Sequence, residues 1–265
     1  MNAPMTAGGR HPGLGLWPYS LAGAAMFLCI WWLLPYTGVV SSALLPSPKA
    51  VGQTFAQLTQ EPFAGYTIQE HVLSSFKRYA MGFGLAAVVG ISLGLLMGWY
   101  RVLDRAVSPI FEAIRFIAPI AWLPFAVLWF GTGLGGPILI IFSGAFPACL
   151  LNAYRGAKLT QSLLIEAAQT LGARPRHIIA EVLLPSAWPS IIAGLRIGAG
   201  VGWQSLIGAE LIVVSSGVGY LMVQGQSNLA TEKVMAGMVA IGLVGALIDV
   251  ALRAVERHFR RFELA

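Results

Sequence analysis

Residues 158–185 read KLTQSLLIEAAQTLGARPRHIIAEVLLP and form a polar interruption between two long apolar segments. Because Gly172 suits a helix stop and Pro175 a helix start, we predict two short helices joined at 172–175. The first of them carries one apolar face, made by Leu163, Leu164, Ala168 and Leu171. A polar helix pair between membrane spans cannot lie in lipid, so we expect it against the membrane surface or a soluble partner.

The rest of the chain has the composition of a membrane protein. Of its 265 residues, 57% are hydrophobic and 11% are charged, which is too apolar for an ordinary soluble domain. A spanning helix needs roughly 20 apolar residues, so we predict an all-α polytopic protein with about six transmembrane helices. They are expected at about 17–40, 76–98, 107–131, 136–156, 187–214 and 234–254. We read the first apolar run, Leu21–Leu34, as an uncleaved span because no small-residue cleavage site follows it.

Basic residues are distributed unevenly between the loops on the two sides of these spans. With six spans, one side holds four of them: Lys49, Lys77, Arg78 and Lys233. The other side holds eleven: Arg10, Arg101, Arg105, Arg155, Lys158, Arg174, Arg176, Arg253, Arg257, Arg260 and Arg261. The Arg-rich side is predicted to be cytoplasmic, with both termini and the 158–185 loop, while the loops at 41–73 and 215–231 face outward. The net charge of +6 comes from these scattered loop residues and does not indicate nucleic-acid binding.

Glycine and proline indicate how the spans pack. Two glycine triplets recur every four residues: Gly90, Gly94 and Gly98, and Gly194, Gly198 and Gly202. Small residues at this spacing let membrane helices approach closely, although glycine is also common in such helices. Pro119 and Pro124 predict a bent or broken helix, which either lines a pathway or is only a kinked packing helix.

Few ionisable side chains fall within the apolar segments. Glu112 and Arg115 are predicted to pair at i,i+3, and Asp249 to pair with Arg253 at i,i+4. Arg196, near the start of its span, is expected to reach toward the membrane interface.

Two runs of sequence, Trp122–Gly131 and Trp203–Glu210, combine apolar area with hydrogen-bonding groups. A small organic anion that passes through a cavity requires both. The two runs supply the predicted pathway residues: Trp122, Trp129, Trp203, Gln204, Ser205 and Glu210. The alternative is that the tryptophans only pack or form an interfacial aromatic belt.

Several common catalytic motifs are missing from the chain. The sequence contains no P-loop, H-E-x-x-H, C-x-x-C or G-x-S-x-G motif, and its four histidines lie outside the predicted spans. We expect no enzymatic role and no cofactor or metal bound by this chain. Cys29 and Cys149 fall in apolar segments and are expected to be packing residues rather than a disulfide.

The spacing within residues 158–185 resembles the EAA loop of ATP-binding-cassette importer permeases. That pattern is EAA, three residues, G, nine residues, I, one residue and LP. Here Glu166-Ala167-Ala168, Gly172 and Leu184-Pro185 fit it, with Val182 in place of Ile. Over roughly 40–260, further segments resemble the nitrate/sulfonate/taurine branch, most of all taurine and aliphatic-sulfonate permeases. They include Leu45-Pro46-Ser47-Pro48, Trp122–Gly131, Phe146-Pro147, Gly194-Leu195-Arg196 and Ala209-Glu210-Leu211.

The resemblance implies a type I importer permease fold. A single permease domain at 17–254 would lie between cytoplasmic tails at 1–16 and 255–265. Residues 158–185 would form a coupling helix that docks on a cytoplasmic ATPase through Glu166, Ala167, Ala168, Gly172, Leu184 and Pro185.

The resemblance also implies partners and a location, the bacterial inner membrane. Two permease chains, expected to be identical, would assemble with two ATPase subunits, which carry the ATP and Mg²⁺. An extracytoplasmic binding protein would deliver the substrate, and membrane lipid would surround the assembly.

Other functions stay open at this point. The same importer type serves nitrate, bicarbonate or heterocyclic vitamin precursors. An ion-coupled secondary transporter or channel would need no docking loop. A membrane anchor that only scaffolds a cytoplasmic complex would explain the loop but not the glycine-seamed spans.

Overall fold

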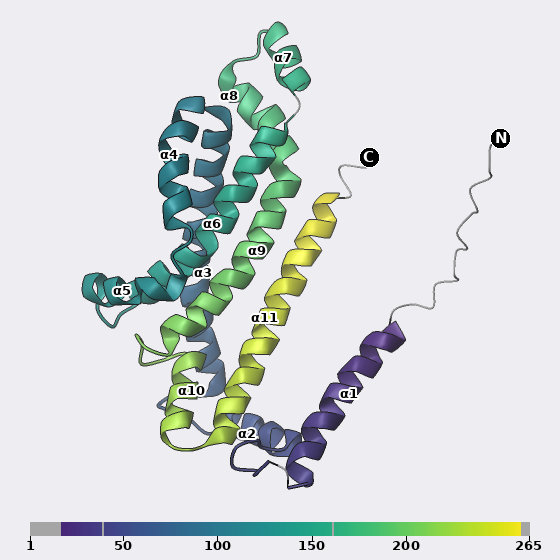
Figure 1. The fold of residues 1–265 in the computed structure, drawn as a ribbon, viewed down its shortest axis with the longest axis vertical. Coiled ribbons are helices and arrows are strands. Elements are labelled where there is room, and N and C mark those ends of the chain that lie inside the picture. The colour runs from purple at the N-terminus through teal and green to yellow at the C-terminus, as the bar shows by residue number, and fades with distance from the viewer. Residues whose placement is uncertain (1–16, 39, 161, 261–265) are drawn as a thin grey trace, which may run out of the picture.

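A computed structural model describes residues 17–260 except 39 and 161, and every regular element among them is helical. Figure 1 shows an elongated bundle with the 158–185 loop projecting at one end. The predicted tail at 1–16 and the last residues of the tail at 255–265 lie outside the described part; helix α11 continues past 254 to Arg260. The elements are α1 (Trp17–Tyr36), α2 (Pro48–Gln60), α3 (Ile68–Trp99), α4 (Arg101–Ile114), η1 (Pro119–Trp122), α5 (Leu123–Phe130), α6 (Gly135–Leu159), α7 (Ser162–Thr170), α8 (Pro175–Ile178), η2 (Ile179–Leu183), α9 (Leu184–Glu210), α10 (Val218–Ser227) and α11 (Thr231–Arg260).

Five described helices are long and apolar enough to cross a membrane, and a sixth crossing exists if the bent pair α4–α5 counts as one. The five are Pro18–Tyr36, Ile68–Trp99, Gly135–Leu159, Pro175–Glu210 and Thr231–Arg257. The predicted all-α polytopic fold with about six spans is therefore confirmed.

The segment predicted as a span at 107–131 is broken, which confirms the bent or broken helix expected from Pro119 and Pro124. The segment begins at Arg101, breaks after Ile114, and turns by 92° before Pro119–Phe130. The cause is local: a proline disfavours helical geometry in the residue before it, and Ala118 accordingly has an extended conformation at ψ 139°. Helix α5 therefore lies across the bundle near the middle of the long helices (Figure 1).

The core is a layer of three helices in which α6 packs between α3 and α9. The predicted glycine seams are confirmed, because both triplets face α6. A Cβ at Gly90 would lie 2.9 Å from Cβ of Cys149, and one at Gly194 would lie 2.6 Å from Cβ of Asn152. Cys149 is buried in this layer as a free thiol, and Cys29 is free and exposed on α1.

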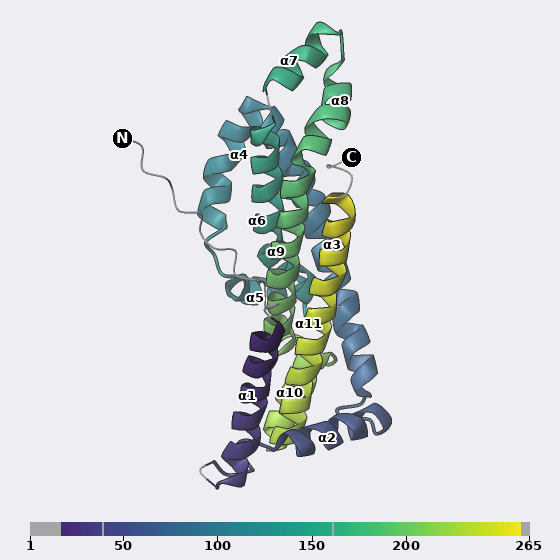
Figure 2. The same cartoon turned by 90° about the vertical axis from the view of Figure 1, so that its right-hand side faces the viewer.

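Two segments predicted as loops contain helices. Within 41–73, α2 lies across the end of the bundle opposite the 158–185 loop (Figure 2), and α3 already begins at Ile68. Within 215–231, α10 packs on α11 at the same end. Val51 and Leu58 of α2 share a buried apolar cluster with Val218 and Leu221 of α10.

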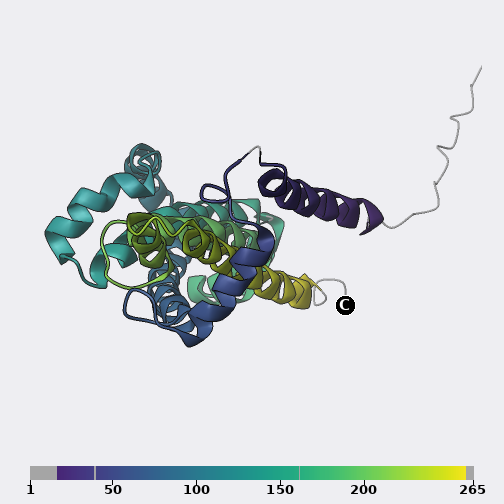
Figure 3. The same cartoon turned by 90° about the horizontal axis from the view of Figure 1, so that it is seen from below.

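Helix α1 diverges from the bundle at its N-terminal end (Figure 3), whereas its Trp31 packs against the apolar cluster shared by α2, α10 and α11. None of the most apolar window of α1 is buried. One tether joins α1 to the following segment, the hydrogen bond from Trp31 Nε1 to the carbonyl of Pro46 at 3.1 Å.

Candidate functional site

The 158–185 loop is a free-standing helical hairpin. Helix α7 is separated from α6 and contacts the short helix α8, and both project beyond the ends of the other helices (Figures 1 and 2). The base of the loop is anchored, because Lys158 Nζ lies 3.1 Å from Oδ2 of Asp104 on α4.

The apolar face predicted on α7 is largely uncovered. Leu163 is 70% exposed and Leu171 88% exposed, and the motif residues Glu166 and Ala167 are exposed beside them. Large apolar side chains presented together on an exposed helix mark a surface that binds another protein or a membrane, and this helix projects beyond the membrane helices. The geometry is suited to docking, since the helix offers an apolar strip with one carboxylate.

Gly172 ends α7 in the left-handed region, at φ +80°. Its N–H donates to the carbonyl of Gln169 at 2.9 Å, and the N–H of Ala173 donates to that of Ala168 at 3.0 Å. This pair of bonds is the Schellman motif, in which glycine is favoured because it lacks a Cβ. The predicted helix stop is confirmed, and the third residue of the EAA triplet is one of its acceptors.

Leu184 and Pro185 explain how the loop returns to the membrane. Proline has no N–H, and its ring crowds the carbonyl four residues earlier. The regular series of α-helical backbone hydrogen bonds is therefore interrupted before it. The N–H of Leu184 donates to Ile179, five residues back, and 179–183 form a π turn. Helical turns nevertheless run on from Pro175 to Glu210, so the loop continues directly into a membrane helix.

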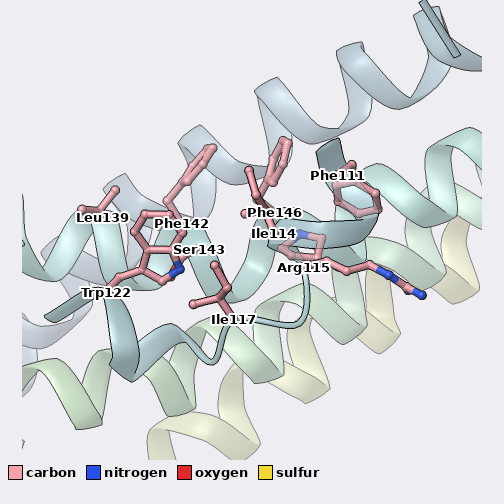
Figure 4. A pocket seen from close by; sticks show the side chains of 10 residues that line it. Phe111, Ile114, Arg115, Ile117, Trp122, Leu139, Phe142, Ser143 and Phe146 are labelled. Carbon is pink, nitrogen blue, oxygen red and sulfur yellow. The ribbon is translucent and has the colours of Figure 1, made fainter. Parts of the chain in front are cut away.

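The predicted pathway residues lie in separate places. Trp122 lines a cavity of about 150 Å³ that lies between α6 and the bend joining α4 to η1 (Figure 4). Its other lining residues are Phe111, Ile114, Arg115, Ile117, Leu139, Phe142, Ser143, Phe146 and Pro147. Trp129 is not among them; it lies on α5 and is 64% exposed.

Residues 203–205 lie on α9 and differ in exposure. Trp203 is only 6% exposed; it donates from Nε1 to the carbonyl of Ile241 at 3.3 Å and packs edge-on to Tyr79. Ser205 donates to Val201 within its own helix, and Gln204 is exposed. Gln204 lines a hollow of about 220 Å³ between α9 and α11, which also contains Arg196 and Asp249.

Glu210 is buried, at 1% exposure, and its carboxylate pairs with Arg78 of α3 at 2.9 Å. Assigning Arg78 to an outer loop is therefore wrong, because it lies ten residues into α3. A signal was present in the sequence: Thr67-x-x-Glu70 is a helix-start pattern, and Glu70 does accept the N–H of Thr67 at 2.7 Å.

The other intramembrane charges are paired. Glu112 and Arg115 form the predicted i,i+3 ion pair at 2.7 Å, and Asp249 forms the predicted pair with Arg253. Arg196 also contacts Asp249, at 3.0 Å, and so joins α9 to α11. Within the described residues, no group of His, Cys, Asp and Glu is arranged to hold a metal ion.

Comparison with known proteins identifies the family. Residues 86–261 match the model of the binding-protein-dependent transport system inner membrane component. The chain belongs to this family. It is the permease of an ATP-binding-cassette importer, in the branch whose members are named for taurine, sulfonate, nitrate or bicarbonate transport.

Two relatives illustrate the branch. The taurine transport system permease protein TauC of Escherichia coli is 35% identical over 90% of this chain and 87% of its own length. The putative aliphatic sulfonates transport permease protein SsuC of Bacillus subtilis is 34% identical over 93% of this chain and 88% of its own.

The fold has a solved counterpart in the MetNI methionine ABC transporter in an inward-facing conformation. That chain matches with a TM-score of 0.62 at 22% identity, over 71% of this chain and 94% of its own length. The type I importer permease fold is thereby confirmed. Family membership replaces the secondary transporter and the scaffolding anchor as explanations.

Proposed function

We propose that this permease imports taurine or another aliphatic sulfonate, driven by ATP hydrolysis on a separate subunit. The observation that carries the proposal is the EAA-spaced hairpin, which projects from the membrane helices and continues through a π turn directly into one of them. The substrate class rests on the names of the relatives at 34–35% identity. The alternative substrates within this importer type are nitrate, bicarbonate and heterocyclic vitamin precursors.

Coupling to the ATPase is assigned to α7 and the turn that follows it. Leu163 and Leu171 would fill an apolar groove of the ATPase, with Glu166 at its edge. Ala167 and Ala168 are small enough to let the helix approach closely, and Gly172 sets the angle between α7 and α8. The permease itself contributes no nucleotide chemistry; ATP and Mg²⁺ would be held by the two ATPase subunits.

A second copy of the chain is the proposed partner within the membrane. Helix α5 has eight residues and lies across the bundle. A helix leaves unpaired N–H and C=O groups at each end, and lipid cannot satisfy them. The exposed apolar side chains Phe125, Leu128 and Trp129 would therefore face another protein chain beside a wet pathway rather than lipid alone.

The substrate-binding protein would dock at the end formed by α2 and α10, opposite the coupling loop. This orientation follows from the charge distribution, since the Arg-rich loops cluster with 158–185 and the positive-inside rule places them in the cytoplasm. Because Arg78 lies in α3 rather than in an outer loop, the outer loops hold fewer basic residues than predicted. The excess of basic residues on the side of the coupling loop is therefore larger.

Cysteine labelling tests this orientation. In a parent lacking Cys29 and Cys149, we expect Ala173→Cys to react with an impermeant maleimide only from the cytoplasmic side. Gln60→Cys and Gln226→Cys should react only from outside, because they lie near the ends of α2 and α10. The reverse pattern would refute the orientation and the proposed docking faces together.

Gln204 gives the sharpest test of the pathway. Because its side chain is exposed beside the α9–α11 hollow, Gln204→Ala should lower uptake by about tenfold, the size of a lost interaction of roughly 1.4 kcal/mol. Assembly with the ATPase should be unchanged, and Gln53→Ala on α2 serves as the control. Trp203→Ala is less informative, because removing a buried tryptophan costs about 3–5 kcal/mol of stability. Parental uptake by Gln204→Ala would remove α9 from the pathway.

The function itself is tested with the permease, its ATPase and its binding protein in proteoliposomes. We expect ATP-dependent accumulation of labelled taurine and competition by ethanesulfonate. Accumulation of nitrate or bicarbonate without taurine would instead select the alternative substrates. Native mass spectrometry of the same complex should give two permease copies.

A further inference from the structure

A buried polar network joins α3, α9 and the start of α10 at the end opposite the coupling loop. Its centre is the Glu210 carboxylate, on the last residue of α9. Ser75 Oγ donates to it from 2.8 Å, Arg78 Nη1 donates from 2.9 Å, and the N–H of Gly219 donates from 3.1 Å. Three elements that are far apart in the sequence therefore converge on one carboxylate.

The same side chains fix the turn between α9 and α10. Arg78 donates to the carbonyl of Ser216 at 2.8 Å and to its hydroxyl at 2.6 Å. The N–H of Val218 donates to Ser75 Oγ at 3.0 Å, and the N–H of Gly217 donates to His71 Nδ1 at 3.0 Å. Three successive N–H groups at the start of α10 are thus paired with side chains of α3 and α9, and they are the groups a helix cannot pair internally.

Stability alone is a weak explanation for this arrangement. A buried ion pair often contributes no more to stability than apolar side chains of the same volume, because both charges lose their water. In some proteins, buried charges and directed hydrogen bonds instead select one geometry between the elements they join. Here that geometry is the position of α10 relative to α3 and α9.

The network also lies at one end of a long, continuous helical segment. The helical turns that start at Pro175, directly after the coupling turn, continue over 36 residues to Glu210. At 1.5 Å per residue this element is about 54 Å long. Its two ends are the coupling turn at Gly172 and the Glu210 carboxylate.

We propose that Glu210, with Arg78 and Ser75, is a positioning lock that makes the α9–α10 turn follow displacements of the coupling loop. The inference rests on the proposed coupling function and adds the place where the motion arrives. Glu210 was predicted as a pathway residue, but its carboxylate is bonded to Ser75, Arg78 and Gly219, and the lock gives it a positioning role instead of a substrate contact.

The test uses a readout at the turn that needs no knowledge of the substrate. Ser215 is exposed in this turn, so Ser215→Cys in a parent without Cys29 and Cys149 reports its accessibility. In the complete complex in proteoliposomes, the maleimide labelling rate should change by about tenfold when ATP is added, within the usual range of coupling between sites. In the charge-neutral variant Arg78→Gln/Glu210→Gln, the complex should assemble and hydrolyse ATP, but ATP should no longer change the labelling rate.

A second perturbation leaves every charge in place. Gly217 has φ +114°, and a Cβ there would overlap the Glu210 carboxylate, so Gly217→Ala should also remove the ATP response. Gly65→Ala is the matched control, because Gly65 has φ +91° and nothing lies within 4 Å of its added Cβ. If Arg78→Gln/Glu210→Gln does not assemble, the comparison of these two alanine variants decides.

Two results would overturn the lock. One is an ATP-dependent labelling change that is as large in the assembled lock variants as in the parent. The other is a parent whose turn does not respond to ATP at all. Taurine accumulation by the parent is measured separately, so a wrong substrate assignment leaves the labelling result intact.

Discussion

Replacing Gly172 by valine is expected to lower import by about tenfold or more while leaving the membrane helices folded. No atom lies within 4 Å of a Cβ added at Gly172, so the substitution causes no clash. Its cost is the left-handed conformation at φ +80°, about 1–2 kcal/mol for a residue with a Cβ and more for a β-branched one. A cost of that size lowers the population of the native turn by about tenfold or more. Helices α7 and α8 would then meet at another angle, and uptake in proteoliposomes should fall by a similar factor.

Gly172→Asn is the control for this prediction, because asparagine adopts the left-handed conformation more readily than other residues with a side chain. We expect it to retain a large part of uptake and to bind the ATPase normally. Valine and asparagine variants that both import at the parental rate would show that the turn geometry does not matter for coupling.

The features of the hairpin that could be predicted are those set by neighbouring residues. The stop at Gly172 and the restart at Pro175 depend on local backbone preferences, and both occur where expected. The π turn at 179–183 was not predicted. It combines a missing donor at Pro185 with the need to keep α9 packed on α6, and the second factor is absent from the local sequence.

The partner of Glu210 illustrates a different limit. The carboxylate was placed near the end of its span, but its buried cation was counted among loop charges. Ser75 and Arg78 lie at i,i+3 on α3, with His71 one turn earlier, so a shared helical face was detectable. That this face meets Glu210, 132 residues later than Arg78, follows only from how α3 and α9 pack.

The bend at 115–118 likewise depends partly on neighbouring residues and partly on packing between helices. The prolines predicted a bent or broken segment there, but not the direction in which it turns. The direction of the turn depends on α6 and α9: a Cβ at Gly144 of α6 would meet both Pro119 and Ser205, so η1 packs closely where a glycine leaves room. The same tertiary contacts decide which cavity Trp122 enters.

The largest effect on stability is expected from filling the glycine seam between α9 and α6. A Cβ at Gly198 would lie 2.9 Å from Sγ of Cys149 and 3.0 Å from the carbonyl oxygen of Ala145. The oxygen belongs to the backbone of a central helix and cannot move aside without shifting α6. Gly198→Leu should therefore separate the two helices and destabilise the permease by about 3 kcal/mol or more, at the upper end of overpacking costs. Thermal unfolding of the purified permease in detergent measures this loss.

Gly200→Leu on the same helix isolates the packing contribution. Nothing lies within 4 Å of a Cβ at Gly200, two residues from Gly198, and the longer side chain would extend into the hollow between α9 and α11 rather than into α6. Both substitutions gain the same helix propensity, about 0.8–1 kcal/mol relative to glycine, and this gain cancels in the comparison. Gly200→Leu should unfold at or slightly above the parental temperature, and Gly198→Leu well below it. Equal unfolding temperatures for the two variants would mean that α9 does not approach α6 through the glycine face.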